Sequence, residues 1–258
     1  MSIDEETLKA MVKAVGPGSS STTFVKGTRL TLGAVADKVS RNNHPWSVHD
    51  VKDLVSSAVK GDKVRLLFGG VDKSEVAPLA SAVAKAFSLY SRKTSAEPKK
   101  GEDSDEEGES GDDCRTLSVS FLEAESEKIL DDQATLQAAA AVTEGVQLAA
   151  RLVDMTPEEL TTDAYAQECR LIAQELNVPM AEIVGEELKE KGYGGIYGVG
   201  KAASCPPRLI IMEYNPPDTP TENVALVGKG IVYDTGGLSL KPKTGMCGMK
   251  GDMGGSAG

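Results

Sequence analysis

Charged residues in the stretch Ala225–Gly258 have the types and spacing of a cation-binding site. Apolar, strand-like runs end in Lys229 and Asp234, while Lys241 and Asp252 lie in connecting segments. Carboxylate oxygens suit divalent cations such as zinc, manganese and magnesium. A lysine can join them only as the neutral amine, which requires a strongly lowered pKa. The sequence therefore indicates a metal site with an unusual lysine ligand.

Each of these residues also has an ordinary structural explanation. Lys229 stands between two glycines, as a surface-loop lysine would, and Asp234 precedes Thr-Gly-Gly, as in an Asx-type turn. Asp252 fits a helix N-cap, where aspartate is favoured. Taken singly, these explanations are as good as the functional one.

The second half of the sequence predicts the elements that must position these side chains. Helical periodicity predicts a long connecting helix over Leu130–Val153, and alternating helices and strands follow it. The expected helices are Thr162–Leu176 and Glu186–Lys191, and the expected strands are Val178–Val184, Arg208–Tyr214 and Val224–Val227. This alternation predicts a largely parallel sheet covered by helices, with polar groups at strand ends projecting into a ligand crevice.

The first part of the chain has the pattern of a small α/β unit. Strands predicted over Lys63–Phe68 and Thr116–Leu122 accompany an amphipathic helix over Ser74–Tyr90. The tract Lys99–Asp113 has eight acids, three glycines and no apolar residue, so we expect a disordered surface loop. A regulatory role for Ser104 is the alternative. The fold class is therefore α/β, with domains at 1–125 and 126–258.

Composition limits the classes of function. Lys and Arg total 28 against 39 Asp and Glu, and the net charge of −11 argues against nucleic acid or anionic membrane as partners. We see no secretory leader and no apolar run near the roughly 20 residues that span a bilayer. The four cysteines are widely spaced, which fits reduced thiols better than disulfides or a zinc knuckle. We expect a cytoplasmic protein.

The stretch VGKGIVYDTGG, followed by SLKP and DMGG, resembles the leucyl (cytosol) aminopeptidase family, and most of all its probable aminopeptidase-like branch. That family has a metal-binding lysine, an aspartate five residues later, a catalytic lysine twelve later and a second metal-binding aspartate twenty-three later. The corresponding residues are Lys229, Asp234, Lys241 and Asp252. Four matched spacings favour the functional explanation over the structural ones.

The resemblance implies a metal-dependent aminopeptidase that acts on peptides. It implies a small α/β N-terminal domain, the first part of an α/β metallopeptidase catalytic domain, and a homo-oligomer, the hexamer. Two divalent ions, zinc or manganese, are the implied cofactors. By resemblance Lys229, Asp234 and Asp252 are metal ligands, with Asp234 bridging both ions. Lys241 would stabilise the oxyanion as the catalytic residue, and Met249 would line the substrate pocket.

The family's later motif, roughly NTDAEGR, has no counterpart in the chain. By resemblance it supplies a further aspartate, a bridging glutamate and an arginine. We therefore expect the chain to be a fragment whose site is incomplete. The chain as given offers three of the family's five ligands, so we expect no peptidase activity and only weak binding of divalent metal.

Two other classes of function are alternatives. If Gly258 is the natural terminus, a non-catalytic or assembly subunit becomes the leading interpretation. A nucleotide-binding loop is less consistent, because Gly195–Ala202 satisfies G-x-x-x-x-G-K but ends in alanine where Ser or Thr holds magnesium. His44 and His49 do not share a helical face and lack a third ligand nearby, so we expect surface or turn roles.

Overall fold

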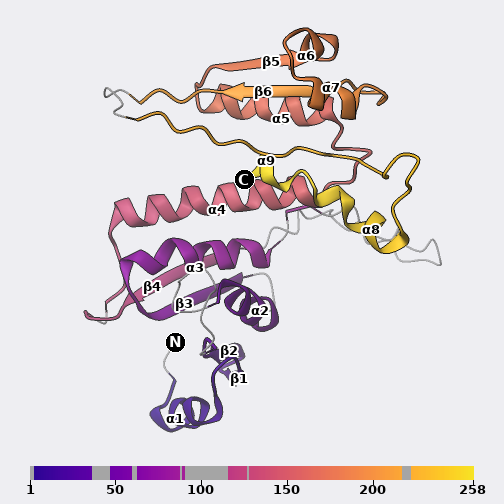
Figure 1. Ribbon diagram of the computed structural model, residues 1–258. Helices are drawn as coiled ribbons and strands as arrows, with labels where there is room; N and C mark the ends of the chain where they lie inside the picture. Colours follow the sequence, from indigo (N-terminus) through magenta and orange to yellow (C-terminus); the bar gives the residue numbers. More distant parts are fainter. Residues whose placement is uncertain are drawn as a thin grey trace, which may run out of the picture. The chain divides into compact units, whose positions relative to one another are not determined.

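The computed structural model describes residues 3–36, 47–59, 63–87, 89–90, 116–126, 128–216 and 222–258. The chain forms two compact units, Met1–Gln147 and Leu148–Gly258. Both contain helices and strands (Figure 1), which confirms the α/β class. The acidic tract 99–113, His44 and Cys114 lie outside the described residues.

The first unit begins with a helix and a hairpin. Helix α1 (Glu5–Ala14) precedes strands β1 (Ser20–Val25) and β2 (Thr28–Gly33), which pair in antiparallel fashion. The two residues that join the strands, Lys26 and Gly27, have φ values of 50° and 79°. Tight two-residue hairpin turns need such positive values, so the glycine is suited to this position.

A parallel pair of strands forms the core of the first unit. β3 (Lys63–Val71) and β4 (Thr116–Glu123) run parallel and confirm the two strands predicted there. Helices α2 (Val48–Ala58) and α3 (Lys73–Ala86) contribute apolar side chains to the same buried cluster as these strands. The connection between parallel strands therefore includes a helix, as is usual for this pairing.

The amphipathic helix predicted over Ser74–Tyr90 is present as α3, but it ends earlier, at Ala86. Phe87 leaves the helical conformation with φ −126° and ψ 101° and packs against the core from an extended backbone. The spacing also predicts one apolar face, and five of its six residues are buried while Phe87 is half-buried; the five are Val76, Leu79, Ala80, Val83 and Ala84.

Helix α4 (Gln133–Asp154) is the long helix predicted over Leu130–Val153. Ala139 belongs to the apolar cluster of the first unit, and Leu152 belongs to that of the second. The two compact units divide inside this helix, at 147/148, whereas the sequence placed a domain boundary at 125/126. Periodicity locates a helix but does not tell which core each turn of it joins.

The second unit contains the remaining elements predicted up to Tyr214. These are α5 (Thr162–Glu175), β5 (Met180–Val184), α6 (Glu186–Glu190) and β6 (Arg208–Met212), with a further short helix, α7 (Gly194–Gly200). The expected parallel pairing is wrong here, because β5 and β6 are antiparallel. Helices α6 and α7 come between the two strands in the sequence and reverse the direction of the chain, so β6 returns beside β5 in the opposite direction.

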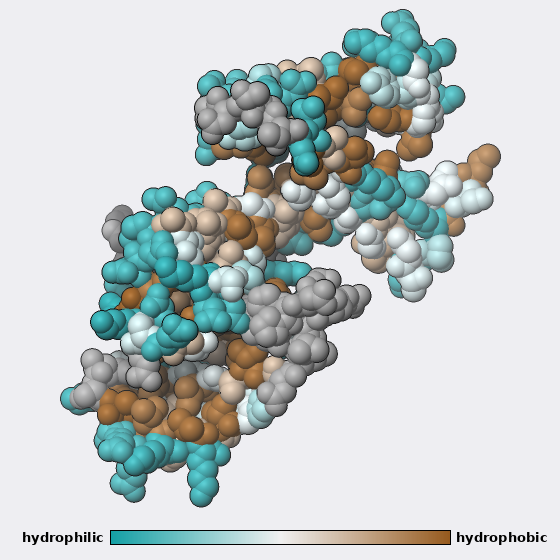
Figure 2. All heavy atoms as spheres, turned by 60° about the vertical axis from the view of Figure 1, so that its left-hand side comes forward, coloured by the Kyte–Doolittle hydropathy of each residue, from teal (hydrophilic) through white to brown (hydrophobic). Residues whose placement is uncertain are grey.

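The strand predicted over Val224–Val227 is absent. This stretch has no strand partner among the described residues, and Leu226 and Val227 are 94% and 97% exposed. Apolar residues favour a strand only where a neighbouring strand supplies the hydrogen bonds. On the face drawn in Figure 2, apolar surface (brown) is likewise exposed beside polar surface (teal). The segment continues into α8 (Lys243–Gly248), the 3₁₀ turn η1 (Met249–Gly251) and α9 (Gly254–Ala257).

Arginine–carboxylate pairs link α5 to both strands of the second unit. Glu182 on β5 accepts hydrogen bonds from Arg170 Nε at 2.7 Å and from an Arg208 nitrogen at 2.9 Å. Arg208 also pairs with Asp163 at the start of α5. We call these four residues the arginine network. The side chains of Glu182 and Arg208 are only 18% and 14% exposed, so this part of the network is largely removed from water.

Other side chains from the sequence analysis differ in their exposure. His49 is exposed on α2, as expected. Cys169 is buried, Cys205 is half-buried and Cys247 is exposed, and all three are free thiols. None of the helices within the described ranges combines the length and apolar character needed to cross a membrane.

Candidate metal centre

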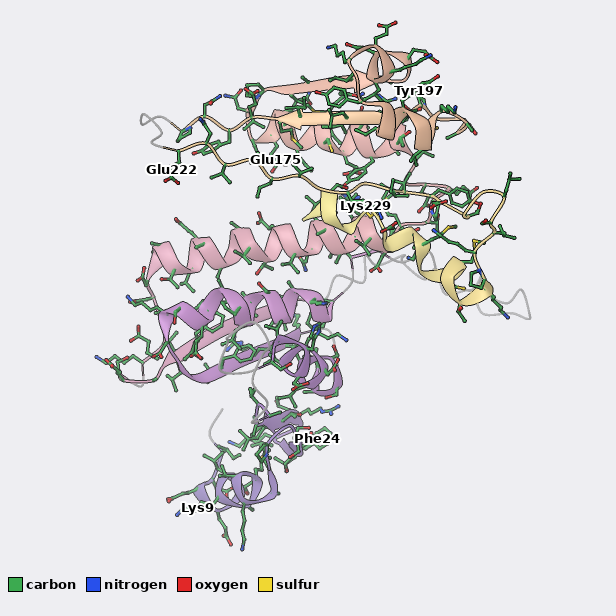
Figure 3. All side chains as sticks on the ribbon, viewed as in Figure 1. Lys9, Phe24, Glu175, Tyr197, Glu222 and Lys229 are labelled. Carbon is green, nitrogen blue, oxygen red and sulfur yellow. The ribbon has the colours of Figure 1, made fainter. Side chains whose placement is uncertain are left out.

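The four charged residues singled out in the sequence form two lysine–aspartate pairs. Lys229 Nζ lies 2.8 Å from Asp252 Oδ2, and Lys241 Nζ lies 3.3 Å from Asp234 Oδ2. Lys229 lies close to α9 (Figure 3). The carboxylates of Asp252 and Asp234 are 42% and 47% exposed, so a ligand can approach both from solvent.

A tight turn holds Asp234. The Gly236 N–H donates to Asp234 Oδ1 at 2.8 Å, and Lys241 Nζ donates to the Asp234 carbonyl oxygen at 2.7 Å. Gly236 has φ 91°, and a Cβ there would lie 2.3 Å from the Ser239 carbonyl oxygen, so only glycine fits. The Asx-type turn is therefore present, and it orients the same carboxylate that was predicted to bind metal.

These contacts lower the pKa of Asp234 below its usual value. The hydrogen bond from the Gly236 N–H has the largest effect, followed by the hydrogen bond and the charge of Lys241. The charge of Lys229 lowers the pKa further by a smaller amount. Asp234 is thus kept ionised, and Lys229 acts electrostatically on it as well as pairing with Asp252.

The glycines beside Lys229 allow a close approach of two backbone segments. A Cβ at Gly228 would lie 2.5 Å from the Gly255 carbonyl oxygen, and one at Gly255 would lie 3.3 Å from Lys229 N. The Ser256 N–H donates to the Lys229 carbonyl oxygen at 3.1 Å. A side chain at Gly228 would force the segments apart and move Lys229 away from Asp252.

Lys250 anchors the turn before Asp252 to α4. Its Nζ donates to the carbonyl oxygen of Asp154, the last residue of α4, at 2.5 Å. A cation at this end of a helix lies beside the last carbonyl groups and interacts favourably with the helix dipole. Met249, the predicted substrate-binding residue, begins η1 and is half-buried.

Tyr165 was not found by sequence reasoning. Its hydroxyl oxygen lies 2.9 Å from Ser256 Oγ, in the segment that contacts Lys229. The two residues are 91 positions apart, and a tyrosine on the apolar face of α5 has the pattern of an ordinary core residue. No local signal in the sequence indicates this contact.

The donor set is suited to a divalent cation. Each aspartate already attracts a positive group, since a lysine ammonium lies within 3.3 Å of it. A lysine coordinates a cation only as the neutral amine, a form that the charge of the cation itself favours. The described part of the chain contains no cluster of three or more His, Cys, Asp or Glu side chains able to hold a metal. A site here therefore needs the lysine beside the two carboxylates.

The G-x-x-x-x-G-K stretch Gly195–Ala202 is not a phosphate-binding loop. Most of it lies inside α7, which follows the charged helix α6, whereas a phosphate loop leaves a strand and leads into a helix. A Cβ at Gly200 would lie 2.4 Å from Pro207 Cβ, so close packing explains this glycine.

Comparison with known domains assigns both units of the chain to peptidases. Residues 2–96 match "M17 aminopeptidase N-terminal domain 2", and residues 147–258 match "Cytosol aminopeptidase family, catalytic domain". The architecture is therefore that of a two-domain α/β peptidase. The two matches together cover most of the sequence, so the chain belongs to the cytosol aminopeptidase family.

Individual relatives are similar to this chain over most of its length. "Probable aminopeptidase NPEPL1" of Mus musculus is 37% identical over 255 residues, 99% of this chain and 46% of that protein. "Leucine aminopeptidase 1" of Caenorhabditis elegans is 36% identical over 88% of this chain and 42% of that protein. The bestatin complex of a Trypanosoma brucei leucyl aminopeptidase matches with a TM-score of 0.79 at 34% identity, over 98% of this chain and 48% of that one. The chain thus spans about half the length of these relatives.

Proposed function

We propose that this protein is a metal-dependent aminopeptidase that removes N-terminal residues from peptides. The observation that carries the proposal is the pair of lysine–aspartate contacts at the spacing typical of the cytosol aminopeptidase family. Exposed carboxylates beside lysines are suited to binding a cation that a substrate can also reach. The names of the relatives, all aminopeptidases, agree with this reaction.

In this proposal Lys229, Asp234 and Asp252 would hold two divalent ions, zinc or manganese, and Asp234 would serve both, as the family resemblance implies. Bound cations of this kind activate a water molecule and polarise the scissile carbonyl group. The residues of the chain orient the donor atoms. The Gly236 N–H fixes one oxygen of Asp234, and the packed glycines hold Lys229 opposite Asp252.

Lys241 is proposed to stabilise the negative charge that develops on the substrate oxygen. Its ammonium group donates to both the carbonyl and the carboxylate oxygens of Asp234. An ammonium has three N–H groups, so these two contacts leave one for a substrate oxygen. A donor that is already oriented stabilises developing charge without reorganisation during the reaction.

The proposal extends to substrate, assembly and compartment. Met249, half-buried and close in sequence to Asp252, is proposed to contact the side chain of the substrate's N-terminal residue. We further propose a homo-hexamer in the cytoplasm, as the family resemblance implies. The net charge of −11 supports peptides rather than nucleic acid or anionic membrane as partners.

Replacement of the bridging carboxylate tests the proposal. In the native protein, Asp234→Ala should abolish metal-dependent hydrolysis of aminoacyl anilides, because one ligand serves both ions. Asp53→Ala is the matched control, since Asp53 is an exposed aspartate of the first unit that pairs with Lys52. Full activity in Asp234→Ala would show that the assigned site is wrong.

A further inference from the structure

Two backbone hydrogen bonds tie the segment of Lys229 to the segment of Asp252. The Ser256 N–H donates to the Lys229 carbonyl oxygen at 3.1 Å, and the Ile231 N–H donates to the Asp252 carbonyl oxygen at 3.3 Å. The Lys229 ammonium and the Asp252 carboxylate lie 2.8 Å apart within this arrangement. A displacement of Ser256 would therefore move Lys229 relative to Asp252.

A hydroxyl group from α5 fixes Ser256. Tyr165 Oη lies 2.9 Å from Ser256 Oγ, and Ser256 Oγ donates to the Met253 carbonyl oxygen at 2.8 Å. A serine hydroxyl has one proton, so a bond to Met253 leaves Ser256 Oγ to accept the proton of Tyr165. The hydrogen bonds then run in one direction, from Tyr165 through Ser256 to Met253.

Tyr165 is itself held firmly. Its side chain is 9% exposed and packs in an apolar cluster with Leu152, Leu160 and Met253. Burial raises the pKa of the Tyr165 hydroxyl, so the group stays protonated and able to donate at neutral pH. The Tyr165 hydroxyl is therefore a fixed, neutral donor to Ser256, in the segment beside Lys229.

We propose that Tyr165 and Ser256 are positioning residues that set the separation of Lys229 and Asp252 and thereby the affinity of the site for a divalent cation. The part of this inference that concerns metal affinity rests on the proposed function. Ser256 acts through the Lys229 backbone, and Tyr165 acts through Ser256. A Cβ at Gly230 would lie 3.0 Å from Ser256 Oγ, so the glycine leaves room for this hydroxyl.

Amide hydrogen exchange on the 258-residue chain tests the geometric part without metal. Tyr165→Phe keeps the buried ring and removes only the hydroxyl, so the Ser256 and Ile231 amides should exchange up to about tenfold faster. Tyr197→Phe is the matched control, because it removes a tyrosine hydroxyl bonded to Glu186 in the same unit. Unchanged rates at both amides, or an equal rise at all amides of the unit, would overturn the inference.

Cobalt(II) titration, followed by visible absorption, tests the consequence for affinity. Tyr165→Phe and Ser256→Ala should each raise the cobalt dissociation constant about fivefold to tenfold, and the double variant should resemble either single one. Tyr197→Phe should bind as the parent does. Faster amide exchange with unchanged cobalt affinity would refute the positioning role. If the parent binds cobalt no more tightly than Asp234→Ala does, the proposed metal site fails, and the exchange rates still decide whether Tyr165 fixes the two segments.

Discussion

Two sets of ion pairs in the second unit, the arginine network and the candidate metal centre, use different cations in different surroundings. In the arginine network, Glu182 accepts hydrogen bonds from Arg170 and Arg208 and is only 18% exposed. In the candidate metal centre, Asp234 and Asp252 each form an ion pair with a lysine and are 47% and 42% exposed. Glu182 and Arg208 of the first set are largely removed from water, whereas Asp234 and Asp252 of the second set remain open to it.

This difference separates charges that hold the fold from charges that a ligand can reach. A guanidinium group stays protonated and offers several fixed N–H groups, so the arginines serve as permanent partners of Glu182. A lysine is a compact cation that can lose its proton when its surroundings favour the neutral amine. Lysine at position 229 therefore fits the ligand role proposed above, which arginine cannot fill.

The largest expected effect comes from exchanging the two kinds of cation. Lys229→Arg should lower the peptidase activity of the native protein by about a thousandfold or more, because a guanidinium cannot become a neutral ligand. The reverse exchange in the arginine network, Arg170→Lys, should leave activity near that of the parent. Steady-state hydrolysis at saturating manganese measures both. An active Lys229→Arg would remove the distinction between the two sets of pairs.

Removal of the central carboxylate of the arginine network should have the next largest effect. Glu182→Ala leaves the half-buried Arg170 and the more deeply buried Arg208 without their shared acceptor, and should lower the free energy of unfolding by about 3 kcal/mol. Glu187→Ala breaks an exposed pair with Lys191 and should cost less than about 0.5 kcal/mol. Urea unfolding compares the two. Equal losses would show that burial does not distinguish these pairs.

The anchor between Lys250 and α4 should contribute less than the arginine network. Lys250→Met keeps much of the aliphatic side chain and removes the hydrogen bond to the Asp154 carbonyl oxygen, so it should cost about 1 kcal/mol. Lys201→Met, at an exposed lysine, is the control. Thermal unfolding followed by circular dichroism measures both variants. No difference between them would mean that the anchor does not stabilise the unit.

The smallest effect concerns pH. Hydrogen bonds from Arg151 lower the pKa of Glu168 below its usual 4.5, so the folded state binds this proton less readily than the unfolded state. The resulting stability is present above pH 4.5 and is lost as the pH falls through the lower folded-state pKa. Glu168→Gln should therefore flatten the fall in urea midpoint between about pH 6 and about pH 3. An unchanged slope would assign the acid sensitivity to other groups.

Much of the fold could be predicted because it depends on local patterns. The 3.6-residue period located α4 and α5, and short apolar runs located β3, β4, β5 and β6. The direction of pairing between β5 and β6 and the exposure of Val224–Val227 could not be predicted in this way. Both depend on which segments become neighbours in space, which a local pattern does not specify.

The candidate site shows the same limit. Residue type and the spacing shared with the aminopeptidase motif singled out Lys229, Asp234, Lys241 and Asp252, and the structure brings these residues together in pairs. Which lysine faces which aspartate follows from the turn at Gly236 and from the close backbone approach at Gly228, which are features of three-dimensional packing. The roles of these side chains in binding metal and in catalysis remain proposals that the substitutions above test.

The long-range contacts of the candidate metal centre imply an order of folding. The contacts of Arg151 with Glu168 and of Arg170 with Glu182 span only 17 and 12 positions, whereas Lys250 meets Asp154 across 96. Short loops close at lower entropic cost, and domains fold from the N-terminal side during synthesis. The arginine pairs can therefore form while α8 and α9 are still unmade. Lys229 meets Asp252 only after η1 has been synthesised, so the centre forms on segments whose arginine pairs can already be in place.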